Sequence, residues 1–190
     1  MIYTDNMAYA PLNYLLSAEE YLEFERDAAM RHEYVAGALY ALAGGTRWHN
    51  LIISNLVFHL MSASRGTPCR VYAENFKVRP TADLFYYPDV MVTCHEEEGD
   101  PLYETAPCLL IEVLSKSTAH IDKREKFSAY KQIETLKVYV IVHQDKKLVE
   151  RYWVDDEGRW QHAQVSGGQV PLECPTLTLS TEEIYENISF

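Results

Sequence analysis

Apolar positions recur with two different periods along this chain of 190 residues. Over 48–61 they return at helical spacing, which predicts an amphipathic helix that Thr46 can cap. Ser17 and Glu20 have the spacing of a capping box and predict a helix over 17–26. Two further helices are predicted at 122–133 and 181–186.

Short runs rich in Val, Ile, Leu and aromatic residues predict strands between these helices. A hairpin is expected over 31–43, with Ala36 and Gly37 at its turn. The other predicted strands are 69–79, 85–93, 108–114, 138–143, 148–154 and 160–165. The order of elements predicts an α/β fold with a central mixed β-sheet flanked by helices, followed by C-terminal β-hairpins.

The length favours one domain over 1–190, with 1–14 as a flexible or extended N-terminal arm. No apolar stretch reaches the roughly 20 residues that span a bilayer, and the first residues lack the pattern of a signal peptide. The sequence therefore predicts a cytoplasmic protein with no membrane partner.

Charge and cysteine usage narrow the functional classes. A net charge of −11 works against general affinity for nucleic acid, so any such site must be a local basic patch. The four cysteines are widely spaced and form no Cys-x-x-Cys unit, which argues against a zinc knuckle and a disulfide scaffold. They are Cys69, Cys94, Cys108 and Cys174.

Two acidic residues, Asp89 and Glu112, each interrupt an apolar run. An ionised carboxylate in a buried strand costs several kcal/mol unless a cation or hydrogen bonds compensate it. The hydrophilic segment 96–101 lets the two strands lie side by side, so that both carboxylates can reach one ion. Mg²⁺ suits such a pair and phosphodiester hydrolysis is the natural reaction, although either acid could instead belong to a structural hydrogen-bond network.

The residues around this pair resemble the Pro-Asp…(Asp/Glu)-x-Lys nuclease superfamily, and more specifically a family of putative restriction endonucleases expanded in photosynthetic bacteria. The resemblance lies in 32–37, 43–45, 49–50, 87–90, 111–115, 117–118, Asp122, Lys126 and Tyr130. It implies a restriction-endonuclease-like core, a Mg²⁺ cofactor (Mn²⁺ possible) held by Asp89 and Glu112, a DNA substrate and a homodimer.

The chain departs from the superfamily pattern at Leu114, where a lysine is expected. That lysine normally activates water or stabilises developing negative charge. Lys126 is the preferred substitute, because Asp122, Lys126 and Tyr130 share one helix face; an ion pair with Asp122 is the structural alternative. Lys116 competes, because it keeps the strand parity of Glu112, but it lies two residues too far along.

The resemblance also indicates Glu33 as a third acid at the site, either binding metal through water or orienting Lys126. A surface pair with Arg31 is the alternative for Glu33. His49 has either a supporting role or a purely structural one. The expected phosphate contacts are Lys77, Arg79, Arg124 and Lys131.

Two functional hypotheses remain. The first is a metal-dependent DNA endonuclease, which the paired acids favour. The second is a catalytically degenerate nucleic-acid-binding or protein-interaction domain, which Leu114 and the acidic charge favour. A degenerate site would show acids that lie far apart or are neutralised by basic side chains.

Overall fold

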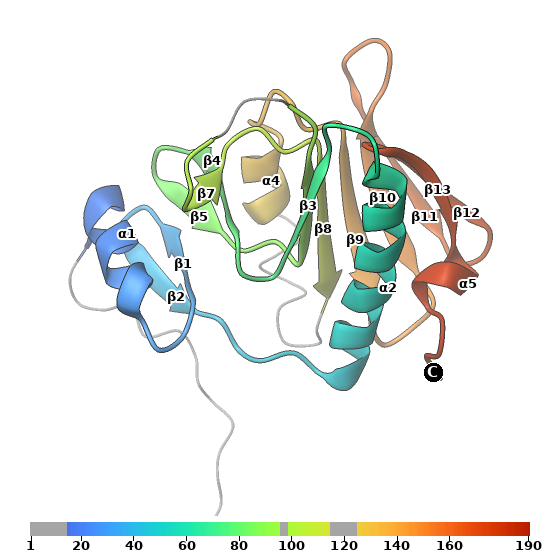
Figure 1. Cartoon of the computed structure of the whole chain (residues 1–190), viewed down its shortest axis with the longest axis horizontal. Coiled ribbons are helices and arrows are strands. Elements are labelled where there is room, and N and C mark those ends of the chain that lie inside the picture. Colours follow the sequence, from blue (N-terminus) through green and yellow to red (C-terminus); the bar gives the residue numbers. More distant parts are fainter. Residues whose placement is uncertain (1–14, 96–98, 115–124) are drawn as a thin grey trace, which may run out of the picture.

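The computed structural model describes residues 15–95, 99–114 and 125–190. Its main layer is a six-stranded sheet with the order β11-β10-β9-β8-β6-β3 (Figure 1). The strands β8 and β9 run parallel and the other neighbours run antiparallel, which confirms the predicted mixed sheet. The strands are β3 (Arg70–Ala73), β6 (Val90–Thr93), β8 (Leu109–Leu114), β9 (Val138–His143), β10 (Val149–Val154) and β11 (Trp160–Val165).

A second sheet of five strands, which the sequence does not predict, has the order β2-β1-β5-β4-β7. Its strands are β1 (His32–Val35), β2 (Ala38–Ala41), β4 (Lys77–Thr81), β5 (Leu84–Tyr86) and β7 (Tyr103–Glu104). The β1–β2 hairpin confirms the turn at Ala36 and Gly37.

The segments 69–79 and 85–93, each predicted as one strand, are divided between the two sheets. Glu74, with a φ of 56°, lies in the first break. Pro88 lies in the second, where it has no N–H to donate to a ladder. The second break positions the site, because Asp89 comes directly before β6 instead of within a continuous strand.

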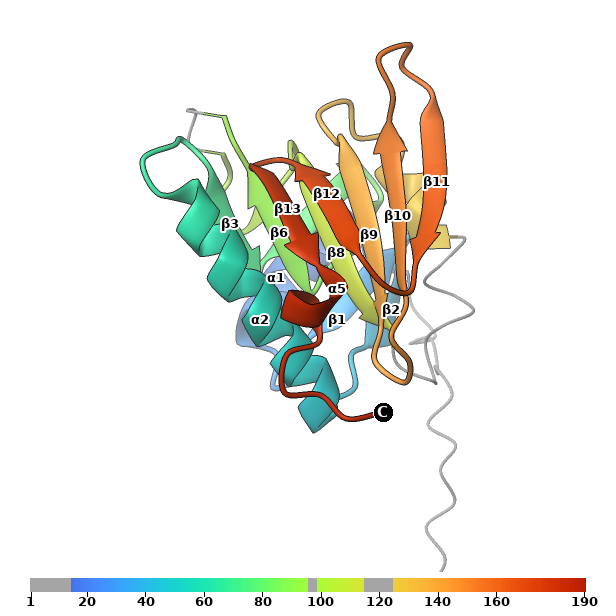
Figure 2. The ribbon, with the colours of Figure 1, turned by 90° about the vertical axis from the view of Figure 1, so that its right-hand side faces the viewer.

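One face of the six-stranded sheet is covered by helix α2 (Arg47–Ser64), helix α5 (Thr181–Ile184) and a hairpin of β12 (Gln169–Glu173) and β13 (Thr176–Ser180) (Figure 2). Thr46 accepts a hydrogen bond from the backbone N–H of His49, which confirms it as the N-cap of α2. The predicted strands 148–154 and 160–165 extend the central sheet as β10 and β11, so β12–β13 is the separate C-terminal hairpin.

The opposite face carries helix α4 (Phe127–Tyr130) and part of the five-stranded sheet. Within the described residues α4 ends at Tyr130, earlier than the predicted 133, and residues 122–124 lie outside the description. Helix α1 (Ala18–Asp27) packs on the five-stranded sheet and begins with the predicted capping box of Ser17 and Glu20.

The four cysteines meet at one end of the six-stranded sheet. Disulfides join Cys69 to Cys94 and Cys108 to Cys174, across 25 and 66 residues of sequence. The prediction that wide spacing argues against disulfides is wrong, because strands that are distant in the sequence begin and end side by side in the sheet.

Among the described residues, no helix has both the length and the apolar character that a membrane crossing requires. The expected N-terminal arm, 1–14, lies outside the described residues.

Candidate active site

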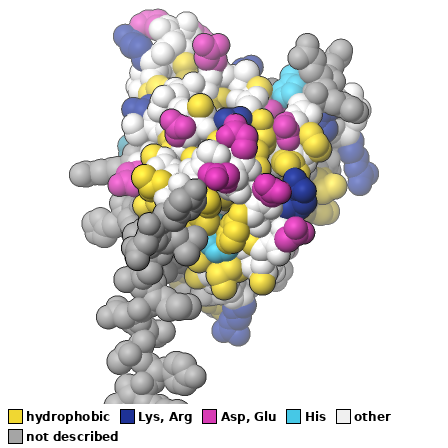
Figure 3. Space-filling model, turned by 90° about the vertical axis from the view of Figure 1, so that its left-hand side faces the viewer, with side chains coloured by type: hydrophobic (Ala, Val, Ile, Leu, Met, Phe, Trp, Pro, Cys, Tyr) yellow, Lys and Arg dark blue, Asp and Glu magenta, His cyan; other side chains and the backbone are white. Residues whose placement is uncertain are grey.

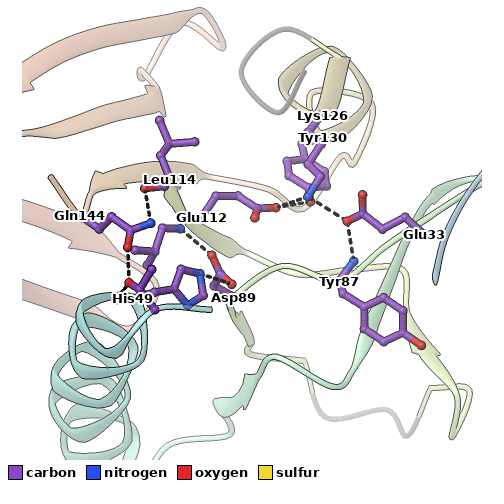
Figure 4. Close-up of polar contacts among 11 residues, drawn as sticks. Glu33, His49, Tyr87, Asp89, Glu112, Leu114, Lys126, Tyr130 and Gln144 are labelled. Atoms are coloured by element: carbon purple, nitrogen blue, oxygen red, sulfur yellow. Dashed lines mark hydrogen bonds and ion pairs between the residues drawn. The ribbon is translucent and has the colours of Figure 1, made fainter. Parts of the chain in front are cut away.

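Asp89 and Glu112 lie opposite each other on neighbouring strands. Val90 pairs with Ile111 in the antiparallel register of β6 and β8, so the residue before Val90 faces the residue after Ile111. The backbone N–H of Val113 donates a 2.6 Å hydrogen bond to Asp89 Oδ2. This contact fixes the carboxylate of Asp89 against the strand that carries Glu112, as the sequence predicts for a shared site (Figure 4).

His49, in the first turn of α2, holds the other oxygen of Asp89. Its Nε2 lies 3.2 Å from Asp89 Oδ1. Burial lowers the pKa of His49, but the hydrogen bond and the charge of Asp89 outweigh burial and leave the pKa raised. Its Nδ1 is buried and has no hydrogen-bond partner among the described residues. His49 thus connects the beginning of α2 to the acid before β6.

Lys126 lies between two carboxylates on the other side of the site. Its Nζ is 2.8 Å from Glu33 Oε1 and 3.4 Å from Glu112 Oε1. The hydroxyl of Tyr130, one turn further along, donates a 2.7 Å hydrogen bond to the same oxygen of Glu112. The backbone N–H of Tyr87 donates to Glu33 Oε1 at 3.3 Å. Glu33, Glu112 and Lys126 therefore come together from β1, β8 and the start of α4 (Figure 4).

Leu114, where the superfamily has lysine, is buried in the apolar cluster beneath α4 that also contains Tyr130 and Tyr139. Its carbonyl accepts a 2.9 Å hydrogen bond from Gln144 Nε2, and Gln144 Oε1 accepts one from the hydroxyl of Thr46. Leu114 therefore contributes an apolar side chain to this cluster and no charge to the site. The ammonium beside Glu112 comes from the helix instead.

The candidate site brings three carboxylates and one ammonium together. Asp89, Glu33 and Glu112 carry three negative charges if ionised, and Lys126 supplies one positive charge. Burial and the carboxylate of Glu112 raise the pKa of Tyr130 well above its usual value, so this tyrosine stays a neutral donor. The carboxylate oxygens of Asp89 and Glu112 are ligand types that Mg²⁺ and Mn²⁺ accept.

The expected phosphate contacts are not all on the surface. Lys77 is buried, and its ammonium donates to the hydroxyl of Tyr87 at 3.3 Å. Burial lowers the pKa of Lys77, although Glu25 partly offsets this. Arg79 packs over the rings of Phe85 and Tyr103.

The other two predicted phosphate contacts are Lys131 and Arg124. Lys131 is exposed at the end of α4 and lies 4.9 Å from the ring centre of Phe127. Arg124 lies outside the described residues, as do Lys116 and Asp122, so the alternative partners proposed for this region are not described.

Sequence reasoning missed Gln144. It directly follows β9, whose residue His143 is in parallel register with Leu114, so its side chain reaches the end of β8. The sequence feature that could have identified Gln144 is a polar residue directly after a fully buried strand, at the same end of the sheet as the predicted acids. Tyr87 was also missed as a site residue, because its contribution is a backbone N–H that no side-chain pattern indicates.

Comparisons with known proteins identify the fold and the family of this chain. A solved structure, described as a putative nuclease from Anabaena variabilis, superposes with a TM-score of 0.74 over 89% of this chain and 97% of that chain. The sequence identity is 17%, so this similarity shows the fold alone, and it confirms the expected restriction-endonuclease-like architecture.

Sequence relatives extend over nearly the whole chain. An uncharacterized protein from Synechocystis sp. is 30% identical over 178 residues, which cover 92% of this chain and 94% of the relative. A second uncharacterized protein from the same organism is 29% identical over 163 residues, 84% of this chain and 92% of the relative. The family model described as "Putative restriction endonuclease" (Uma2) matches residues 18–183, and the chain belongs to this family.

Proposed function

We propose that this chain is a metal-dependent endonuclease that hydrolyses phosphodiester bonds in DNA. The observation that carries the proposal is the position of Lys126, 3.4 Å from Glu112 on the strand next to Asp89. This supplies the three groups of the superfamily pattern, two acids and one lysine, with the lysine coming from a helix. The descriptions of the family and of the solved neighbour support the same reaction class.

Asp89 and Glu112 are the proposed metal ligands, with Mg²⁺ as the expected ion and Mn²⁺ as a second candidate. Both residues offer hard oxygen donors from rigid strand positions, and Val113 and His49 already orient the carboxylate of Asp89. When bound, the ion would polarise the phosphate and lower the pKa of a bound water.

Lys126 is the proposed electrostatic and water-orienting group. Hydrolysis adds a water oxygen to phosphorus and expels one sugar oxygen, so negative charge develops on the phosphate and on the leaving group. An ammonium fixed beside Glu112 favours that charge and can orient the attacking water. Glu33 is a positioning residue in this proposal, because its 2.8 Å contact holds the ammonium and its own oxygen is held by the N–H of Tyr87.

The net negative charge of the protein repels the phosphates of DNA. Figure 3 shows a face on which acidic side chains are scattered among apolar and a few basic ones. The proposal therefore needs local cations, and Lys131 on α4 is the described basic residue that we assign to phosphate contact. Arg79 and Arg124 remain candidates from the sequence.

The test is cleavage of plasmid, single-stranded DNA and RNA in Mg²⁺ or Mn²⁺ at one fixed salt concentration. We expect plasmid cleavage by the wild type and a loss of at least about 100-fold in Asp89→Asn and Lys126→Met. Asp83→Asn and Lys146→Met make the same charge changes at exposed positions and should cleave normally. Cleavage that survives in both site variants would contradict the assignment.

The second candidate function is a degenerate domain that binds nucleic acid or protein without catalysis. It is favoured by one specific observation, the pairing of the Lys126 ammonium with both Glu33 and Glu112. Isothermal titration of the wild type with Mg²⁺ and Mn²⁺ separates the two functions. Binding that Asp89→Asn removes supports the nuclease, whereas the absence of metal binding together with the absence of cleavage supports the degenerate domain.

We also propose that the chain acts as a homodimer, because restriction-like nucleases that cut both strands of a duplex commonly dimerise with two-fold symmetry. Light scattering at several concentrations, coupled to size-exclusion chromatography, tests this. A monomer that makes double-strand breaks in single binding events would contradict it.

A further inference from the structure

A second cluster of chemically reactive side chains lies far along the sheet from the candidate active site. Cys69 directly precedes β3, Cys94 follows β6 and Cys108 directly precedes β8. Because β6 is antiparallel to both of its neighbours, these three positions share one end of the sheet. Asp89 precedes β6 and so marks the opposite end. Cys174, in the turn between β12 and β13, completes the cluster.

Three of the four sulfur atoms converge on one small volume, and the fourth, that of Cys69, adjoins it through Cys94. The Sγ atoms of Cys94, Cys108 and Cys174 all lie within 4.8 Å of one another, and Cys94 Sγ is 3.2 Å from Cys174 Sγ. Cys69 is joined to Cys94 by a disulfide. A tetrahedral zinc ion with Zn–S bonds of about 2.3 Å places its sulfur ligands roughly 3.8 Å apart, which these positions approach. Two independent disulfides need no such convergence.

The backbone holds these positions in place. Arg70, next to Cys69, donates a 2.9 Å hydrogen bond to the carbonyl of His95, next to Cys94, and so fastens the two strand ends together. The N–H of Cys108 donates to the carbonyl of Val92 at 2.8 Å. Cys108 and Cys174 are buried in the apolar cluster under α2, which keeps water from the ligands. Such surroundings suit a closed structural site.

We propose that, in the reduced protein, Cys69, Cys94, Cys108 and Cys174 bind one Zn²⁺ as a four-thiolate structural site. The ion would fasten the β12–β13 hairpin, through Cys174, to the starts of β3 and β8 and the end of β6. This site is separate from the proposed nuclease centre in ligands, position and metal preference, because thiolates select zinc and carboxylates select Mg²⁺.

The disulfide form and the zinc-bound form are alternative states of the same four cysteines, connected by reduction of the disulfides followed by zinc binding. Reduction of the two disulfides takes four electrons and four protons, which two equivalents of a phosphine reductant supply as each is oxidised to phosphine oxide with oxygen from water. Binding of one Zn²⁺ to the four thiols then releases up to four protons and leaves a complex with a charge of −2.

The experiment measures zinc directly and does not depend on nuclease activity. The full chain is produced with added zinc, purified with a phosphine reductant, and its metal content determined by mass spectrometry of the elements. We expect one zinc per chain in the wild type and below about one tenth in Cys108→Ser or Cys174→Ser. Asp89→Asn, which alters only the other proposed site, should keep its full zinc content.

A spectroscopic measurement on the unaltered chain covers the case in which the cysteine variants fail to fold. Co²⁺ replaces zinc in tetrahedral thiolate sites, so the wild type should show intense thiolate-to-cobalt charge-transfer absorption at one Co²⁺ per chain. An organomercurial should release one zinc per four thiols modified. Absence of zinc and of the cobalt spectrum in the reduced wild type would overturn the proposal, as would zinc that Asp89→Asn removes.

Discussion

The ammonium of Lys126 lies 3.4 Å from the carboxylate of Glu112, although the two residues are 14 positions apart and belong to different elements. The superfamily pattern places this lysine two residues after the acid, on the same strand. Here that position is Leu114, which points into the apolar cluster beneath α4. An ammonium therefore lies beside Glu112, but it comes from the residue before α4 and not from β8.

Moving the lysine back to the strand tests this relationship. Lys126→Met should lower the cleavage rate by about 100- to 10,000-fold, because it removes the ammonium that stabilises the negative charge developing on the phosphate. Adding Leu114→Lys to that variant should restore at least about tenfold, since residues 112 and 114 point to the same side of β8. Rates are compared with those of Leu114→Lys alone, which carries both lysines.

One result would contradict the predicted rescue. If the double variant folds, as judged by circular dichroism, and cleaves no faster than Lys126→Met, the lysine at 114 does not reach the acid and the equivalence of the two positions is wrong.

Removal of the Tyr130 hydroxyl should destabilise the fold even without metal. This buried hydroxyl donates a 2.7 Å hydrogen bond to Glu112, and bonds to charged acceptors contribute about 1.5–3 kcal/mol. Tyr130→Phe is therefore expected to lower the free energy of unfolding by that amount in urea titrations. Tyr34→Phe is the matched control, because its hydroxyl donates to the neutral carbonyl of Leu16 and should cost about 0.5–1.5 kcal/mol. Equal losses in both variants would show that Glu112 is not ionised.

Divalent ions should stabilise the protein through Asp89 and Glu112, the proposed metal ligands. At an ion concentration of about 100 times Kd, binding adds about 2.7 kcal/mol, which corresponds to roughly 5–10 °C in Tm for a chain of this size. Glu112→Gln should abolish this increase. It should also lower the stability of the metal-free protein, because Glu112 pairs with Lys126 and accepts a hydrogen bond from Tyr130, so each variant is compared with its own metal-free form. Scanning calorimetry with and without Mg²⁺ makes the comparison; an undiminished increase in Glu112→Gln would place the ion elsewhere.

Local patterns in the sequence were sufficient for much of the fold. The capping box of Ser17 and the cap at Thr46 depend on contacts within four residues, so spacing alone identified both helix starts. The pairing of β6 with β8 followed from the hydrophilic segment between two apolar runs. These features could be predicted because they depend on residues or segments that lie close together in the sequence.

The unpredicted parts depend on contacts between distant residues. The breaks at Glu74 and Pro88 divide apolar runs between two sheets, and periodicity cannot distinguish one long strand from two short strands in different sheets. Gln144 and the cysteine cluster were missed for the same reason, since both arise where strands far apart in sequence end together. For Lys126, helix-face spacing indicated its direction and the family resemblance indicated Glu33 as a residue that orients it or binds metal, but only the second sheet, which carries Glu33, shows the 2.8 Å contact.

The buried ammonium of Lys77 predicts a specific dependence of stability on pH. Burial lowers its pKa in the folded state, whereas the unfolded chain titrates near 10.4. Between these two values the unfolded chain binds more protons, so the free energy of unfolding should rise with pH there. Below the pKa of the folded state, Lys77 is charged in both states, so the full cost of burying its ammonium lowers the free energy of unfolding. Urea titrations from pH 7 to 10.5 should show that Lys77→Met lacks this component of the rise, while Lys146→Met, altered at an exposed site, retains it.

The same burial predicts how Lys77 and Lys131 differ toward DNA. Each phosphate contact by a lysine adds about 0.9 to the slope of log K against log salt concentration. Lys131 is exposed, so Lys131→Met should weaken binding and reduce that slope by about one contact. Lys77 donates to Tyr87 within the protein, so Lys77→Met should leave affinity and slope unchanged. Fluorescence anisotropy with a labelled duplex in Ca²⁺, at several salt concentrations, measures both. A reduced slope in Lys77→Met would restore Lys77 to the phosphate contacts that the sequence suggests, and would require Tyr87 to release it when DNA binds.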